Sequence, residues 1–487
     1  MAIDETLPPR LVEALRGRGL VVVTGAGISV APPSDLPSWW GFNTALFESI
    51  KARASETLPG QRELLDNLSL DGRMPVSAFS DLVVRTFAGD GYFPLLTALE
   101  SARPNANHAA LARLAAQGIV SDIVTFNFDT LIEQAFRDAK VRLEVFVNSA
   151  DYERLDLEQG FGPRLHKVHG SVTDAKSLID TVTQKLRGLS SQRRLLLASL
   201  FRSRHILFLG FSGADFDFGS DYLPMGANRE DDFGFTWLHR GTRPTVAARL
   251  AREDGIFLAG SLPDFFERMG VVTDPVPSTT KEPADIRAGI DAWTRKPSVG
   301  PWACASLCQR LAFETGQEAI GRALNDAVAA RLMEELQAQR FDLTMTGAMR
   351  RLALSALESG DIDRALAWSG RELQVYEWVN AILTAGGQKP SPQVRLEYLR
   401  NTAAAYSNIG LAHARSGRPG GLEAAREAFL KAQAQLVDAQ DHDTEALLLF
   451  NKAVHLETER MPAKLGRGGH RSRPSARKPN SCSNSVN

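Results

Sequence analysis

Polar side chains that could act on a substrate follow two short apolar segments of this chain. Asn127 comes two residues after the segment Ile123–Thr125, and His169 comes directly after Leu165–Val168. An asparagine amide both donates and accepts hydrogen bonds, so Asn127 suits holding a hydroxyl group or a water molecule. The imidazole of His169 titrates near neutral pH, which suits a general base. These two residue types could therefore supply a positioning amide and a proton acceptor, although a lone histidine in a sequence is more often structural or exposed.

A third apolar segment leads into a glycine turn. The strand-like run Leu20–Val23 is followed by Gly25-Ala26-Gly27-Ile28-Ser29. Where side chains are absent, backbone N–H groups can approach a pyrophosphate, and the N-terminus of the next helix would face it. The carboxyl ends of strands in an open parallel sheet line the ligand crevice. We therefore expect this turn, Asn127 and His169 to converge on one dinucleotide site.

The elements that must position these residues follow an alternating pattern. From Leu11 to about Pro277, short β-rich apolar runs alternate with longer amphipathic stretches, which predicts an α/β fold with a parallel sheet. Between the first two expected strands, residues 31–118 form a long insertion of mostly helical pattern, which we expect to be a small subdomain over the cleft. The expected strands are Leu20–Val23, Ile119–Thr125, Leu143–Phe146, Leu165–Val168, Ile206–Leu209, Phe235–Leu238 and Gly255–Leu258.

Five motifs in this order resemble those of the sirtuin domain. They are Gly25–Ser29, Leu36-Pro37-Ser38-Trp39, Thr125-Phe126-Asn127-Phe128-Asp129, His169-Gly170 and Leu209-Gly210-Phe211-Ser212-Gly213-Ala214-Asp215. More closely, the set resembles the prokaryotic branch of this family that is found in antiphage defence proteins, over residues from about 10 to about 275. The resemblance implies a Rossmann-like parallel sheet of the sirtuin type and NAD+ as the substrate.

The resemblance also implies which residues bind NAD+. The phosphates and ribose would be contacted by Ala26, Gly27 and Ser29. The loop through Pro37 and Trp39 would cover the nicotinamide end, and the segment Gly210–Ser212 would bind the adenosine half. Deacylating sirtuins have Pro-Asp-Phe-Arg where this chain has Pro-Ser-Trp-Trp, so the roles of that Asp and Arg are not carried over. The implied binding residues are Gly25, Ala26, Gly27, Ser29, Pro37, Trp39, Asn127, Asp129, Gly210 and Ser212.

His169 and Asn127 are the catalytic residues that the resemblance implies. His169 matches the catalytic histidine of the family and would act as the general base. Asp129 either accepts a hydrogen bond from the nicotinamide carboxamide or caps the helix expected to begin at Thr130. His166 and His108 are predicted to be structural. A metal pair of His166 with His169 is not expected, since residues three apart on a strand face opposite sides.

The cysteines argue against zinc and against peptide deacylation. The chain has three, Cys304, Cys308 and Cys482, and none lies near the motifs. They allow neither a disulfide framework nor a four-thiolate zinc site. Deacylating sirtuins carry a zinc ribbon of paired Cys-x-x-Cys motifs that helps to form their peptide groove. We therefore expect no metal, and hydrolysis of NAD+ in preference to deacylation.

Composition limits the location and the partners. A chain of 487 residues with 44% hydrophobic and 23% charged residues is typical of a globular protein with two or three domains. A net charge of −1 gives no basic footprint for nucleic acid. The N-terminus has no signal-peptide pattern, and no apolar run reaches the roughly 18 residues of a membrane span. We expect a cytoplasmic protein that binds neither membranes nor nucleic acid.

Four regions are expected along the chain. Residues 1–278 would form the catalytic domain, 279–295 a linker, 296–461 a helical domain and 462–487 a disordered basic tail. Two segments of the helical domain fit a tetratricopeptide-like repeat imperfectly, and a generic helical bundle remains the alternative. The fit rests on Met349, Leu352, Ala353, Ala356, Gly360 and Ala365 in one segment, and on Tyr406, Ile409, Gly410, His413, Ala425, Phe429 and Ala432 in the other.

These observations predict an NAD+ glycohydrolase that releases nicotinamide and ADP-ribose, with a cyclic product if an adenine nitrogen outcompetes water. Because unrestrained NAD+ loss would kill the host, the helical domain is expected to control activity through homo-oligomer assembly, a companion defence protein or a phage-derived trigger. The alternatives are a protein deacylase, a non-catalytic NAD+ or ADP-ribose sensing module, and a repeat scaffold with a decayed sirtuin domain.

Overall fold

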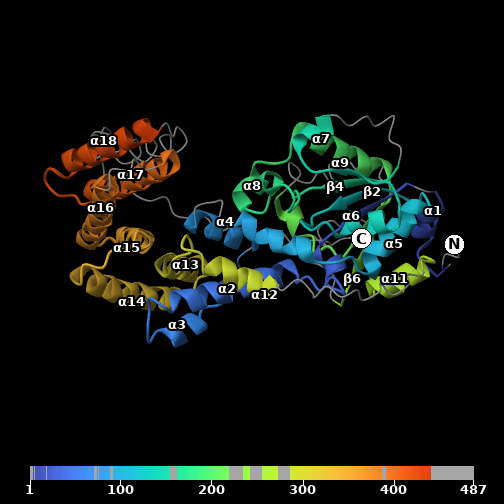
Figure 1. Ribbon diagram of the computed structural model, residues 1–487. Coiled ribbons are helices and arrows are strands. Elements are labelled where there is room, and N and C mark those ends of the chain that lie inside the picture. The colour runs from blue at the N-terminus through green and yellow to red at the C-terminus, as the bar shows by residue number, and fades with distance from the viewer. Residues whose placement is uncertain are drawn as a thin grey trace, which may run out of the picture. The chain divides into compact units, whose positions relative to one another are not determined.

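The structure is a computed structural model that describes residues 4, 6–17, 19–70, 74, 76–87, 92–153, 162–218, 234–241, 255–271, 286–385 and 391–439. The predicted basic tail at 462–487, the end of the predicted helical domain at 440–461 and Cys482 lie outside these residues. The described residues form a parallel sheet flanked by helices, followed by a region made of helices (Figure 1).

Seven parallel strands form one sheet in the order β3-β4-β2-β1-β5-β6-β7 within the described part of the chain. Every expected strand is present, with bounds within one residue of the expected ones, so the predicted α/β fold is confirmed. The strands are β1 (Leu20–Thr24), β2 (Val120–Thr125), β3 (Glu144–Phe146), β4 (Arg164–Lys167), β5 (Ile206–Leu209), β6 (Phe235–His239) and β7 (Gly255–Ala259).

The strand order places a topological switch point between β1 and β5. From β1 the chain continues to β2 on one side of the sheet, and it returns through β5 on the other side. The register aligns the carboxyl ends, since Thr24 of β1 pairs with both Thr125 of β2 and Leu209 of β5. Ligands of open α/β sheets bind in the crevice at such a switch point. The loops after β1, β2, β4 and β5 therefore share one edge of this Rossmann-like sheet.

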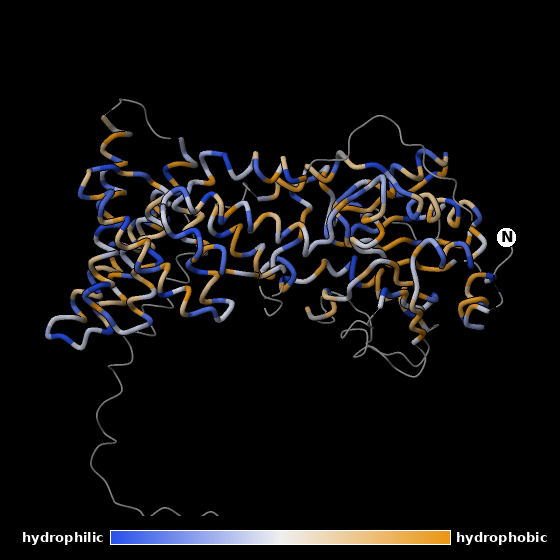
Figure 2. The backbone as a smooth tube through the Cα atoms, turned by 90° about the horizontal axis from the view of Figure 1, so that it is seen from below, coloured by the Kyte–Doolittle hydropathy of each residue, from blue (hydrophilic) through white to orange (hydrophobic). Residues whose placement is uncertain are grey.

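Helices cover both faces of the sheet, because successive strand residues point to opposite sides. Val22 packs with α1 (Pro9–Gly17), α5 (Ala106–Ala116), α6 (Leu131–Asp138) and α11 (Leu262–Arg268). Val21 and Val23 pack on the opposite face with α7 (Ser149–Glu153) and α9 (Ser191–Ser203). Figure 2 shows hydrophobic and hydrophilic residues alternating along the coiled parts of the backbone, as expected for helices with one buried face.

The long insertion after β1 is helical, as predicted. It contains α2 (Trp39–Ala54), α3 (Arg62–Asp66), α4 (Val76–Thr86) and the 3₁₀ segment η2 (Phe93–Ser101) before α5. Between β4 and β5 lie η3 (Ala175–Ser177) and α8 (Val182–Leu186) ahead of α9, and η4 (Ala214–Phe218) follows β5.

The division of the chain differs from the predicted one. The compact units are residues 1–348 and 349–487, whereas the sequence placed the boundary at 278 and a linker at 279–295. The predicted linker contains α12 (Ile286–Thr294), whose Trp293 is buried against the Phe87 ring with centroids 5.3 Å apart. Ser49 of α2 also donates a hydrogen bond of 2.8 Å to Asp291. The apolar face of α12 completes the core of the insertion, so it belongs to the first unit.

Two further helices complete the first unit, and helix pairs form the second. After α12 come α13 (Pro301–Glu314) and α14 (Glu318–Gln337), and α15 (Met345–Ser359) begins at the boundary. The second unit continues with α16 (Ile362–Ala385), α17 (Pro392–Arg415) and α18 (Gly421–Ala439). A Cβ on Gly410 of α17 would lie 2.9 Å from the Phe429 ring of α18, so the glycine permits close packing. The repeat assignment itself remains a prediction.

Among the described residues, no helix has the length and apolar character that crossing a membrane requires.

Candidate active site

The glycine turns after β1 and β5 touch each other at the switch point. The Gly27 N–H donates a hydrogen bond of 2.9 Å to the Gly210 carbonyl oxygen. A Cβ on Gly27 would lie 2.7 Å from Gly210 Cα, and one on Gly210 would lie 2.5 Å from the Ile28 nitrogen. Gly210 also has a φ of +61°, which favours glycine. Two of the predicted binding motifs, Gly25–Ser29 and Gly210–Ser212, are therefore brought together.

The element after the first turn is shorter than expected. In place of the predicted helix, the residues Ala26–Ser29 form the single 3₁₀ turn η1. Pro32 and Pro33 follow closely, and proline lacks the N–H that a continuing helix needs. The next helix, α2, begins only at Trp39. The helical element after the glycine turn is therefore a single 3₁₀ turn, and the approach of its N-terminus to a pyrophosphate stays a prediction.

Ser29 links the glycine turn to the loop after β2. Its Oγ lies 3.2 Å from His108 Nε2, 3.3 Å from Asn127 Nδ2 and 3.2 Å from an Asp129 oxygen. Burial lowers the pKa of His108 to about 3, so this ring is neutral. Its Nδ1 accepts the Asn105 N–H at 3.1 Å, so the ring proton is on Nε2 and is donated to Ser29. His108 is thus structural, as predicted.

The Ser29 side chain has a defined set of partners. It accepts hydrogen bonds from His108 and Asn127 and donates its own hydrogen to Asp129. The Ser29 side chain is 1% exposed. Its predicted contact with the ribose or phosphates of the ligand stays a prediction. What the hydroxyl does here is to fix Asn127 and Asp129 against the glycine turn.

Asp129 lies just before the start of α6. One carboxylate oxygen accepts the Leu131 N–H at 3.1 Å, and the other accepts the Ser29 hydroxyl at 3.2 Å. This helix begins at Leu131, one residue later than expected. Burial raises the pKa of Asp129, and the nearby Lys167 opposes that effect. The Asp129 side chain thus binds the first N–H of α6, whose N-cap residue is Thr130, and its contact with the nicotinamide carboxamide stays a prediction.

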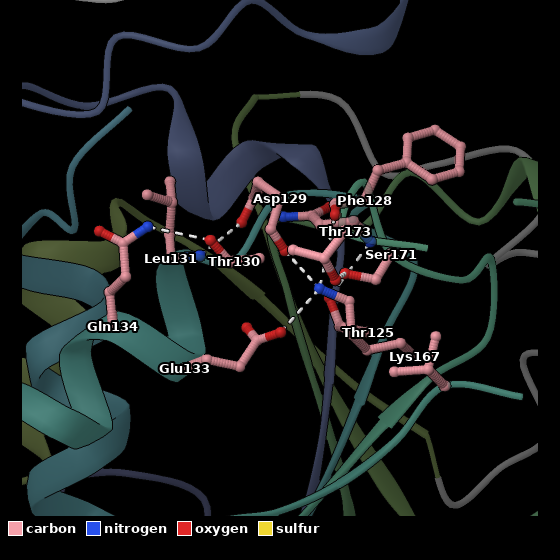
Figure 3. A network of polar contacts seen from close by, with 12 residues as sticks. Thr125, Phe128, Asp129, Thr130, Leu131, Glu133, Gln134, Lys167, Ser171 and Thr173 are labelled. Carbon is pink, nitrogen blue, oxygen red and sulfur yellow. Dashed lines mark hydrogen bonds and ion pairs between the residues drawn. The ribbon is translucent and has the colours of Figure 1, made fainter. Parts of the chain in front are cut away.

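A buried lysine ties the loop that carries Asn127 to the strand that leads to His169 (Figure 3). Lys167, at the end of β4, is fully buried. Its ammonium group donates to the carbonyl oxygens of Phe128 and Asp129 and pairs with Glu133 of α6 at 2.9 Å. A buried ammonium group needs such partners. Lys167 therefore holds the two loops of the predicted reactive centre in one arrangement, which the sequence analysis did not foresee.

His169 lies between two aromatic rings of that same loop. The Phe126 ring meets it edge-on with centroids 5.1 Å apart, and the Phe128 ring stacks on it at 5.7 Å. His169 and Asn127 are 5% and 7% exposed, so both are nearly covered by protein. Since Asn127 lies between the two phenylalanines in sequence, the structure places the predicted amide and base on adjoining loops.

Trp39 extends this aromatic group. Its ring stacks on Phe42 with centroids 4.9 Å apart and meets Phe128 edge-on at 5.2 Å. Ser38 caps the helix at this point by accepting the Gly41 N–H at 3.1 Å. The Pro37–Trp39 segment therefore reaches the loop next to His169, and its place over the nicotinamide end of the ligand stays a prediction.

The sequence analysis missed the charged partners of His169. Nε2 of His169 lies 3.2 Å from Oδ1 of Asp215, and that oxygen also pairs with Lys185 at 2.8 Å. Asp215 belongs to the fifth motif, but it was assigned no role, and Lys185 stands in no motif. Burial acts to raise the pKa of Asp215, but Lys185 and His169 bring it below its ordinary value. Burial lowers the pKa of His169, and Asp215 opposes that effect.

Other predicted residues lie apart from this centre. His166 is buried and pairs with Asp122 at 3.0 Å, which agrees with its predicted structural role. Ser212 is exposed after β5, where its Oγ accepts the Ala214 N–H at 3.5 Å. Its contact with the adenosine half of the ligand stays a prediction.

No group of three or more His, Cys, Asp or Glu side chains in the described ranges is arranged to hold a metal ion. Cys304 and Cys308 lie on α13, and both are buried and reduced. Burial raises the pKa of Cys308 to about 12, which keeps its thiol protonated.

Chelation is therefore expected to leave the protein unchanged. Treatment with EDTA or phenanthroline should alter neither the melting temperature nor the enzymatic activity, because the predicted chemistry uses no zinc and the described residues include no group of side chains arranged to hold it. Metal content by mass spectrometry and thermal melting check this. Stoichiometric zinc together with unfolding on chelation would contradict it.

Comparison with known proteins points to one family. No curated protein matches the chain. A family match covers β2, β4, β5 and the loops that carry Asn127, His169 and Asp215. That family acts on NAD+, and the placement of these loops at the switch point fits a dinucleotide. Residues 121–223 of this chain match the SIR2-like domain.

Proposed function

We propose that the protein is an NAD+ glycohydrolase that cleaves NAD+ to nicotinamide and ADP-ribose. The observation that carries the proposal is the joint position of Asn127 and His169 on adjoining loops of a SIR2-like segment. These loops lie at the same sheet edge as the contact between Gly27 and Gly210. The glycine turns supply a backbone surface for the dinucleotide, and the two side chains supply the chemistry.

In the proposed reaction, breaking the nicotinamide–ribose bond builds positive charge on the ribose. Asn127 holds a water molecule or a ribose hydroxyl beside the reacting carbon. His169 accepts the proton, either directly from the water or through a ribose hydroxyl. Burial lowers the pKa of His169, so the imidazole is neutral and able to accept a proton near neutral pH. Water is the second substrate in this proposal, because the chain lacks the paired Cys-x-x-Cys motifs of the ribbon that helps deacylating sirtuins to form their peptide groove.

The aromatic rings around His169 support this chemistry. Phe126 and Phe128 flank the imidazole, and Trp39 extends the apolar surface on the side of the Pro37 loop. An apolar surround excludes additional water and strengthens the electrostatic interactions in the site. Departure of a planar, uncharged nicotinamide suits a pocket lined by aromatic side chains.

The biological role in the proposal is antiphage defence through NAD+ depletion. It rests on the resemblance of the five motifs to the prokaryotic defence branch of the family. An enzyme that removes NAD+ needs restraint, and the helix pairs of residues 349–439 are suited to sensing or assembly. We propose that they mediate homo-oligomer formation or recognition of a companion protein or a phage-derived trigger.

Removing the second unit should reveal this control. A protein ending at Ala348 is cut in the first turn of α15 but keeps α12, α13 and α14, whereas one ending at Ser278 would lose the partners of α2. We expect the Ala348 protein to differ from the full chain in oligomeric mass or in basal NAD+ turnover. Light scattering and a nicotinamide assay measure both quantities. Identical mass and turnover would refute control by the second unit.

Product analysis separates the proposal from its alternatives. The full chain is incubated with NAD+ alone and with NAD+ plus an acetyl-lysine peptide, with and without extract from infected cells. A glycohydrolase releases nicotinamide and ADP-ribose without the peptide. A deacylase needs the peptide and forms O-acetyl-ADP-ribose, and a sensing module binds NAD+ without releasing nicotinamide. Chromatography of the products distinguishes all three outcomes and any cyclic ADP-ribose.

A further inference from the structure

Three buried ionisable side chains lie in contact with one another beside the proposed reactive centre. Asp215, in η4 after β5, lies between His169, which follows β4, and Lys185 of α8. A single oxygen of Asp215 lies 3.2 Å from His169 Nε2 and 2.8 Å from Lys185 Nζ. All three residues are at most 8% exposed. Burying such a group is costly unless each charge has a partner, so the arrangement calls for an explanation.

The other groups around His169 do not replace this carboxylate. The loop after β2 contributes the uncharged rings of Phe126 and Phe128. Asp180, just before α8, also acts on His169 through its charge, but its carboxylate accepts the Tyr92 hydroxyl at 2.8 Å. Asp215 is thus the carboxylate in contact with the ring, and Lys185 is the cation in contact with that carboxylate.

We propose that Asp215 is a positioning residue, whose carboxylate orients the His169 imidazole and stabilises the imidazolium formed when His169 accepts a proton, while Lys185 holds Asp215 ionised. This role rests on the proposed function, because it assigns a partner to the proposed base. The proton comes from the attacking water or a ribose hydroxyl, resides on His169 and is released to solvent afterwards. Asp215 stays ionised throughout.

The two charges act on His169 in opposite directions. A carboxylate at contact distance favours the imidazolium, whereas the ammonium group behind it disfavours that form. Asp215 therefore raises the pKa of His169, and Lys185 lowers it. A neutral His169 is the active base, so the rate rises as the pH rises through this pKa. This rise is the acidic limb of the pH–rate profile, called the pH limb below. Removing the charge of Asp215 or of Lys185 should shift the pH limb, and the two removals should shift it in opposite directions.

The test measures the pKa of His169 by NMR titration of histidine-labelled full-length protein, with the His169 signal assigned by its loss in His169→Gln. In Asp215→Asn the pKa should fall by about one pH unit or more, and in Lys185→Met it should rise. The nicotinamide-release rate of Asp215→Asn should drop about 10-fold or more, with its pH limb moved downward. The limb of Lys185→Met should move upward.

Matched controls remove similar charges from exposed positions. Asp138→Asn at the end of α6 and Lys176→Met in η3 should leave the His169 pKa and the pH limb unchanged. Thermal melting checks that each variant folds. The double variant Asp215→Asn/Lys185→Met removes both charges together, so that neither is left buried without its partner. Its His169 pKa should lie between the His169 pKa values of the two single variants.

The readouts separate this proposal from the proposed function. A His169 pKa that moves as expected supports the pairing even if the wild-type protein releases no nicotinamide, in which case only the glycohydrolase proposal fails. A His169 pKa that stays the same in Asp215→Asn and in the double variant overturns the pairing. Loss of activity in Asp215→Asn with an unchanged pH limb also overturns it, because that result indicates a merely structural role.

Discussion

Replacing His169 or Asn127 with alanine is expected to lower the rate of nicotinamide release by about 100-fold or more. Without His169 the attacking oxygen has no base, and without Asn127 it is no longer held beside the ribose. Both side chains are buried at the sheet edge, outside the two hydrophobic clusters that pack the faces of the sheet. The measurement is initial nicotinamide release by the full-length variants at saturating NAD+.

Control substitutions match the residue types at positions away from the site. His413→Ala in α17 and Asn67→Ala after α3 should retain wild-type turnover. Because His169 packs against two aromatic rings, His169→Gln serves as a second variant that preserves more of the side-chain volume. Wild-type turnover in folded His169→Gln and Asn127→Ala would refute the assignment of the reactive centre.

Gly210→Ala is expected to destabilise the first unit and to abolish NAD+ binding. The new Cβ would lie 2.5 Å from the Ile28 nitrogen and 2.7 Å from the Gly27 carbonyl carbon, and neither backbone atom can turn away. The φ of +61° adds strain of about 1 to 2 kcal/mol for a residue with a Cβ. Separation of the two glycine turns would then disrupt the backbone surface for the dinucleotide.

Gly118→Ala is the matched control for this substitution. Gly118 also has a left-handed backbone, with a φ of +69°, but a Cβ there would meet no atom within 4 Å. Both variants therefore carry the same kind of backbone strain, and only Gly210→Ala adds the collision. Urea unfolding and calorimetric titration with NAD+ compare them. Equal stability and equal NAD+ affinity in the two variants would contradict the importance of the contact between the turns.

The sheet could be predicted from sequence because each strand is a short apolar run with turn residues on both sides. Burial on both faces removes the alternation of polar and apolar residues, so runs such as Leu20–Val23 and Ile206–Leu209 stand out. The convergence of Asn127, His169 and the glycine turns then follows from the parallel arrangement, which aligns the carboxyl ends of the strands. The order of the strands in the sheet and the register of their pairing could not be predicted from the sequence pattern.

The charged residues that hold the loops of the site in place could not be predicted from apolar runs in the sequence. Lys167 and Lys185 are lysines in amphipathic surroundings, where the usual expectation is exposure to solvent. Only the fold shows that Lys167 meets two backbone carbonyls and that Lys185 meets Asp215. A carboxylate within the fifth motif, six residues after the last residue of β5, was the available indication for Asp215.

The domain boundary was misplaced for a related reason. The proline-rich stretch before residue 286 has the composition of a linker, and the helices after it look alike in sequence. Whether a helix packs on the preceding core or on its successors depends on long-range partners. The contacts of Ser49 with Asp291 and of Phe87 with Trp293 join positions more than 200 residues apart, which no local pattern can indicate.

The central claim is that this chain hydrolyses NAD+ through Asn127 and His169. The most direct measurement is a time course of nicotinamide and ADP-ribose formation from NAD+ alone, for wild type and His169→Ala side by side, each with and without extract from infected cells. The account predicts that wild type forms nicotinamide and ADP-ribose in equal amounts, either without the extract or in its presence. It predicts that the variant forms neither product under either condition. NAD+ binding by wild type without any nicotinamide release under either condition, or equal release by the variant, would contradict it.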